Sequence, residues 1–168
     1  MPKPAKVEAN VRDWLRNERG DTLDAFTRVI TISVVNPGTE VSGSVSVADL
    51  RLPARALGRD LSDMWGVPGH ARAFAVSPST FRVLHLSGWK ERVKEVEAEA
   101  PIGEVTVHHL DDTSQSGHGI RYFVIDLPDG RWMVDSQVVV KKNGERGPFA
   151  ASSDALIEAL GTRAVPIG

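Results

Sequence analysis

The sequence predicts an α+β domain whose largely antiparallel sheet has about seven strands, with three or four short helices packed on it. Two kinds of hydrophobic spacing support this prediction. Apolar residues recur every three or four positions over residues 4–19, which is typical of an amphipathic helix. They alternate with polar residues over 41–47 and flank a Pro-Asp-Gly turn in 120–140, which is typical of antiparallel strands with one buried face. A chain of 168 residues is of ordinary size for a single domain.

The composition excludes several classes of protein. The chain has no cysteine, which excludes disulfide scaffolds, cysteine-ligated metals and cysteine nucleophiles. Lys and Arg number 20 against 22 Asp and Glu, which argues against nucleic acid as a partner. No apolar stretch approaches the ~20 residues that span a bilayer, and the first residues do not form a secretory signal. We therefore expect no membrane partner, and a location in the cytoplasm or in a particle assembled there.

The first third of the chain predicts a helix followed by a hairpin. The helix covers Pro4–Arg19 and ends at Gly20, because glycine commonly terminates helices. A strand then runs from Phe26 to Val34, and a turn at residues 36–38 leads into a second strand over 41–47. A short helix is expected over residues 57–65.

The middle third predicts two strands and a second long helix. The strands lie near residues 70–76 and 80–86, on either side of a Ser-Pro-Ser turn. The helix runs from Ser87, as its N-cap, to Ala100. Its buried stripe consists of Trp89, Val93, Val96 and Ala100. All four tryptophans occupy apolar-periodic positions and are interpreted as core anchors: Trp14, Trp65, Trp89 and Trp132.

The last third predicts more antiparallel sheet and a closing helix. A strand over 104–110 leads into a polar loop at 111–119, which is either a binding loop or a solvated connection. A hairpin follows, with strands at 120–127 and 131–140, and Asn143-Gly144 forms a turn. A helix capped by Ser152 or Ser153 runs to Gly161. We expect one domain over residues 1–168, with terminal arms 1–5 and 162–168 that a neighbouring subunit or partner orders.

The histidines and arginines offer few candidate ligands. His109 and Asp111 share one face of a predicted strand, but a metal site needs three or four converging ligands. We therefore predict no metal site and no cofactor. Arg51, Arg55 and Arg59 recur every four residues and would share one face of a helix, although Pro53 limits that helix to about one turn.

A histidine and an aspartate flank the hairpin of the last third. Gly117-His118, a strand, a Pro-Asp-Gly turn and then Asp135-Ser136-Gln137 resemble the histidine–aspartate hairpin of papain-like and transglutaminase-like enzymes. The resemblance implies a general base at His118, an orienting carboxylate at Asp135 and an assisting amide at Gln137. Enzymes of those families use a cysteine as the nucleophile that attacks the substrate, and this chain has no cysteine.

We therefore predict a non-enzymatic interaction or assembly protein, which binds protein partners or copies of itself. The helix over residues 7–16 is similar to the first helix of small phage tail-completion proteins, and this implies a structural subunit of a phage or mobile-element particle. The first alternative is a small papain- or transglutaminase-like hydrolase or deamidase, or an inactive relative, that uses His118 and Asp135. The second is an inhibitor of the immunity or anti-defence type, which binds another protein.

Overall fold

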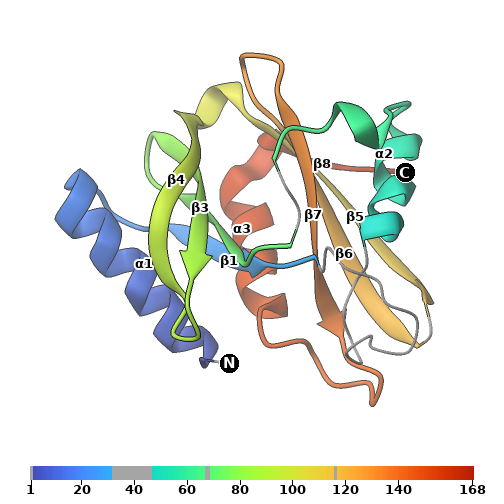
Figure 1. The fold of residues 1–168 in the computed structure, drawn as a ribbon, viewed down its shortest axis with the longest axis horizontal. Coiled ribbons are helices and arrows are strands. Elements are labelled where there is room, and N and C mark those ends of the chain that lie inside the picture. Colours follow the sequence, from blue (N-terminus) through green and yellow to red (C-terminus); the bar gives the residue numbers. More distant parts are fainter. Residues whose placement is uncertain (1, 32–46, 67–68, 116) are drawn as a thin grey trace.

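The computed structural model describes residues 2–31, 47–66, 69–115 and 117–168. Within these ranges, eight strands form two four-stranded sheets and three α-helices pack around them, which confirms the predicted α+β class (Figure 1). The number of strands is close to the seven expected, but they are divided between two sheets. The predicted turn at 36–38, the end of the strand before it and residues 41–46 of the strand predicted after it lie outside the described residues.

Each sheet is built mainly from strands that follow one another in the chain. The first sheet has the order β1-β2-β3-β4, and all of its pairs are antiparallel. The second has the order β7-β6-β5-β8, in which only β5 and β8 are parallel. The strands are β1 (Ala25–Val29), β2 (Arg72–Val76), β3 (Thr80–Ser87), β4 (Arg92–Pro101), β5 (Thr106–Gln115), β6 (His118–Asp126), β7 (Trp132–Val140) and β8 (Ala164–Pro166).

The helices cover the outer faces and one side of this pair of sheets. Helix α1 packs on the first sheet, α2 packs on the second, and α3 packs beside β1 and sends Leu156 and Leu160 into the core between the sheets. Figure 1 shows this order, with α1 and α2 at opposite sides of the molecule and α3 between them. The helices are α1 (Pro4–Arg19), α2 (Arg51–Ala56) and α3 (Ala150–Leu160), with single 3-10 turns at η1 (Val47–Leu50), η2 (Leu61–Asp63), η3 (Ile102–Glu104) and η4 (Gly161–Arg163).

The main core lies between the two sheets. Aromatic and branched side chains from both inner faces are fully buried there, and the rings of Phe74 and Phe123 meet edge to face with centroids 5.7 Å apart. Such pairs add to the stabilisation that burial of apolar area already provides. The core therefore joins β2 of one sheet to β6 of the other.

Helix α1 has the bounds that the sequence predicts. Val7, Val11 and Leu15 are fully buried against the first sheet. Gly20 has a φ of 60° and donates its N–H to the carbonyl of Arg16, so the left-handed residue ends the helix where expected. Local spacing and a glycine cap were sufficient to define this element.

The predicted helix from Ser87 to Ala100 is wrong, because these residues form the turn after β3 and strand β4. Val96, Ala98 and Ala100 alternate with Glu95, Glu97 and Glu99, which is the two-residue period of a strand. Two register shifts in the β3–β4 ladder interrupt this alternation, one between the partners of Ala98 and Val96 and one between those of Glu95 and Val93. Val93 and Val96 therefore pack on the side of α1, whereas Ala98 and Ala100 face the core between the sheets, and the apolar spacing across the shifts imitates a helix.

Three smaller expectations also need correction. Most of the predicted polar loop at 111–119 belongs to β5 and β6, because Asp111 lies opposite Arg121 and accepts its hydrogen bonds. Helix α3 begins at Ala150, and the Ser152 hydroxyl donates to the carbonyl of Phe149 instead of capping the helix. Trp89 is 83% exposed and is not a core residue.

The edges of the two sheets differ in how they are closed. β1 meets β7, where the Ile30 N–H donates to the carbonyl of Ser136 and the Gln137 amide donates to the carbonyl of Arg28. The other two edges are β4, with its charged side chains, and β8, which has three residues and includes Pro166. Charge, shortness and proline all discourage further strand pairing, so these edges are poor sites for sheet-to-sheet assembly.

Candidate functional site

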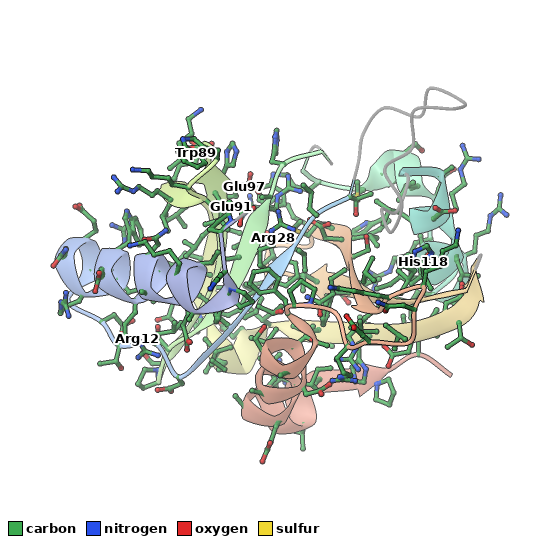
Figure 2. All side chains as sticks on the ribbon, turned by 90° about the horizontal axis from the view of Figure 1, so that it is seen from below. Arg12, Arg28, Trp89, Glu91, Glu97 and His118 are labelled. Atoms are coloured by element: carbon green, nitrogen blue, oxygen red, sulfur yellow. The ribbon has the colours of Figure 1, made fainter. Side chains whose placement is uncertain are left out.

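The structure does not bring His118 and Asp135 together. Asp135 lies opposite Phe123 in the β6–β7 ladder, five residues along β6 from His118, which corresponds to about 17 Å of strand. Successive side chains of a strand point to opposite faces, so His118 shares the outer face with Ile120 while Asp135 points into the space between the sheets. Figure 2 also shows His118 well apart from the labelled Arg28 and Glu97.

Asp135 instead belongs to a buried ion pair between the sheets. Its carboxylate accepts hydrogen bonds from Arg72 at 3.2 Å and from the Thr31 hydroxyl at 2.9 Å. The Arg72 side chain is 2% exposed and also donates to Glu97. Burial raises the pKa of Asp135, and the charge of Arg72 offsets only part of that effect. The residue assigned to catalysis by its resemblance therefore has structural contacts.

Gln137, the third residue of the predicted site, is also buried. Its amide nitrogen donates to the Thr27 hydroxyl and to the carbonyl of Arg28, both at 2.9 Å. These bonds tie β7 to β1, and they account for both hydrogens of the amide group. Neither His118 nor Asp135 is among its hydrogen-bond partners.

A histidine and two glutamates converge at one end of the first sheet. His85 on β3 lies directly opposite Glu95 on β4, with 3.4 Å between its Nδ1 and the Glu95 Oε1. The same nitrogen is 3.9 Å from the Glu97 Oε1. We call His85, Glu95 and Glu97 the His-Glu cluster; it is the one group of potential metal ligands found among the described residues. Sequence analysis missed it because β4 was predicted as a helix.

Neighbouring side chains fix two members of the His-Glu cluster. The ring of His70 stacks on the ring of His85, with centroids 4.5 Å apart. The Glu97 Oε2 accepts a 2.5 Å hydrogen bond from Arg72, so the other oxygen of this carboxylate is turned toward His85. Burial, and then the charge of Arg72, lower the pKa of His70. The cluster is thus held by residues of β2 and of the segment before it.

The turn between β3 and β4 displays Trp89 at the surface. Gly88–Glu91 form this turn, which we call the hairpin tip, and the Glu91 N–H donates to the carbonyl of Gly88. Among the described non-glycine residues, only Glu91 has a positive φ, of 48°. Its carboxylate pairs with Arg28, and both side chains are largely buried. Figure 2 shows Trp89 at the periphery, with Glu91 and Arg28 beneath it.

Helix α1 also contacts the hairpin tip. The amide of Asn10 donates to the carbonyl of Lys90 at 3.1 Å and approaches the carbonyl of Glu91 at 3.4 Å. A left-handed non-glycine residue persists only where its surroundings determine its conformation. Here the ion pair with Arg28 and the hydrogen bonds from the Asn10 amide provide that constraint.

The arginines of the α2 region line a shallow cavity of about 370 Å³. Helix α2 extends past Pro53 to Ala56, and its Arg51 and Arg55 line the same cavity as Arg59 and Asp60, which follow the helix. Arg59 is engaged by both oxygens of Asp126 and lies over the ring of Trp132. The Arg59 guanidinium therefore has a structural partner.

Asp126 is also bonded to His108, whose Nε2 lies 2.8 Å from the carboxylate. Burial alone would raise the pKa of Asp126, but the hydrogen bonds and charges of Arg59 and His108 outweigh it and lower the pKa. On the other face of β5, Asp111 binds Arg121 and not His109. The pair His109 and Asp111 is thus not a joint ligand set.

The lowered pKa of Asp126 predicts a pH dependence of stability. A carboxylate whose pKa falls on folding stabilises the protein above its unfolded pKa of about 3.9, and this contribution disappears as the pH falls through the folded value. Replacing Asp126 with asparagine should therefore lower the free energy of unfolding near neutral pH and have little effect in strong acid. Urea unfolding over a pH series measures this difference. An Arg59→Ala background should shrink it, whereas a difference constant at every pH would contradict the assignment.

Comparison with known proteins assigns neither a family nor a function to this chain. No protein family, curated protein or solved structure matches this chain. Among the described residues, no helix has the length and apolar character required to cross a membrane. The functional argument therefore rests on the geometry above.

Proposed function

We propose that this chain is a non-enzymatic interaction protein that binds a protein partner through the hairpin tip. The observation that carries this proposal is Trp89, a large aromatic residue that is 83% exposed on a constrained turn. Tryptophan is enriched among the residues that dominate interface energies. A constrained turn loses little conformational freedom on binding, so more of the contact energy contributes to affinity.

The charge around the hairpin tip indicates what the partner presents. Lys90, Arg92 and Lys94 are exposed on and beside the tip, whereas Glu91 is buried against Arg28. A matching surface would combine an apolar pocket for the indole with an acidic rim for the cations. The predicted catalytic pair is separated, so the enzymatic alternative has less support from the geometry. The partner can be a subunit of a particle, or it can be an enzyme that this chain inhibits.

The first test combines a Trp89→Ala variant with a Leu52→Ala control, which changes another exposed apolar side chain, on the distant helix α2. Trp89→Ala should change the free energy of unfolding by no more than about 0.5 kcal/mol, because its side chain is 83% exposed, and Leu52→Ala, at 44% exposure, by no more than about 1 kcal/mol. Trp89→Ala should weaken partner binding by about 2 kcal/mol or more. Light scattering over a wide concentration range identifies self-association, and calorimetry with a purified partner, captured from the source organism, measures other binding.

Three outcomes decide the proposal. Oligomers that dissociate in Trp89→Ala but persist in Leu52→Ala support it and make a second copy the partner. A purified partner that binds the wild type and Leu52→Ala, but not Trp89→Ala, supports it and gives the partner's identity. A strictly monomeric protein whose every identified partner binds Trp89→Ala as tightly as the wild type overturns it.

A further inference from the structure

The His-Glu cluster has a geometry that suits a divalent cation. We propose that His85, Glu95 and Glu97 bind a first-row divalent metal ion of the zinc class. The site is independent of the hairpin tip, because none of its ligands contributes to the display of Trp89. It also differs from our expectation that the chain lacks a metal site, which rested on His109 and Asp111.

The distances between the ligand atoms fit such an ion. Ligands about 2.0–2.2 Å from a tetrahedral zinc ion lie about 3.3–3.6 Å from one another. The His85 Nδ1 is 3.4 Å from Glu95 Oε1 and 3.9 Å from Glu97 Oε1, and all three ligand atoms lie within 4.8 Å of one another. Small rotations of the glutamates are therefore sufficient to close the set around a metal.

The surroundings of the cluster orient the ligands before a metal arrives. Metal-binding carboxylates and imidazoles are commonly held by a second group that fixes their orientation. Arg72 holds one oxygen of Glu97 and leaves the other toward His85, and Asp135 in turn anchors Arg72. His70 stacks on the His85 ring and restricts its rotation.

Charge also favours a cation at this place. The carboxylates of Glu95, Glu97 and Asp135 outnumber the nearby cations, Arg72 and Lys94, so these five side chains carry a net negative charge. The donor set of one imidazole nitrogen and two carboxylate oxygens distinguishes zinc-class ions from Mg²⁺ and Ca²⁺. Those two ions prefer oxygen ligands alone and higher coordination numbers.

The experiment is a calorimetric titration of the full chain with Zn²⁺, with Mg²⁺ and Ca²⁺ as competitors. We expect saturable binding of one Zn²⁺ that excess Mg²⁺ does not displace. Glu95→Gln should weaken it at least about tenfold. The Glu95 side chain is 61% exposed, so this variant retains the fold. Glu158→Gln, which removes an exposed carboxylate from α3, is the matched control and should bind like the wild type.

A second readout does not depend on any variant. Nuclear magnetic resonance of the wild-type histidine rings should show Zn²⁺ shifting the signals of His85 while those of His118, on the other sheet, stay in place. No saturable binding, equal affinity for Zn²⁺ in Glu95→Gln and the wild type, or His85 signals that do not respond would each overturn the proposal. Equal affinity for Mg²⁺ and Zn²⁺ would also overturn it, because that behaviour is general attraction to surface carboxylates.

Discussion

Replacing Arg72 with alanine is expected to lower the free energy of unfolding by about 3–5 kcal/mol, the usual cost of breaking a buried ion pair. Its side chain is 2% exposed and lies between Glu97 and the almost fully buried Asp135. The substitution leaves these carboxylates without the cation that compensates their burial. It also deletes a large side chain from the end of the core, which adds to the loss. Urea unfolding monitored by circular dichroism measures the change.

Arg131→Ala is the matched control for this prediction. Arg131 also forms a short ion pair, with Asp129 at 2.6 Å, but both side chains are about half exposed. Water screens such pairs, so the control should cost no more than about 1 kcal/mol. Equal losses for the two arginine variants would show that burial of the Arg72 ion pair does not contribute to stability as we infer.

Replacing Phe123 with alanine is expected to cost about 3–5 kcal/mol, because it leaves a cavity between the two sheets. The Phe123 ring is fully buried and touches the ring of Phe74, which comes from the opposite sheet. The same loss should follow from Phe74→Ala. In the double variant the losses should fall short of additivity by about 0.5–1.5 kcal/mol, which is the contribution of the ring pair itself.

A second double-mutant cycle tests whether this coupling arises from the contact between the Phe74 and Phe123 rings. Phe26 is as large and nearly as buried as Phe123, but it packs with Phe149 beneath α1, in a separate cluster. Phe26→Ala and Phe123→Ala should therefore be additive within about 0.5 kcal/mol. Coupling of equal size in both cycles would mean that the variants loosen the whole fold, and the proposed contact between the sheets would lose its support.

The elements predicted well were those whose signal is local. Pro4–Arg19 has an apolar stripe and a glycine cap within one window of sequence, and both reappear in α1. The hairpin of β6 and β7 was likewise marked by its turn residues. The prediction for β4 was wrong because two register shifts break the two-residue period, and the sequence does not mark where the pairing with β3 imposes them.

Division into two sheets could not be predicted for a related reason. Alternation shows which face of a strand is buried, but it does not show which strand lies beside it. β8 illustrates this point, because residues 164–166 carry little strand signal and are extended through their pairing with β5. Tertiary context, and not local preference, determines such short strands.

The predicted catalytic site was wrong because of strand register, and the His-Glu cluster was missed because β4 was predicted as a helix. A resemblance in spacing placed His118 and Asp135 on adjacent strands, which is correct, but the turn between them fixes a register that puts them on opposite faces. In the same way, His85 meets Glu95 only because β3 and β4 pair. Regular strand alternation would have grouped Glu95, Glu97 and Glu99 on one face, but the register shift between Val83 and Leu84 places Glu95 opposite His85 and Glu99 opposite Arg82, on different faces of the sheet.

The junction of β1 with β7 has a consequence for the order of folding. Strands β2–β4 and β5–β7 are two meanders whose paired strands follow one another in the chain, so each can form before distant segments meet. Residues 30–71 separate β1 from β2, so β1 joins the first meander through a longer connection. Thr31 and Ser136, which meet at the junction, are 105 residues apart. Closing so long a loop has a large entropic cost, and contacts of this kind slow folding. The junction should therefore close late, after both meanders have formed, and its amide hydrogens should be among those that gain protection last.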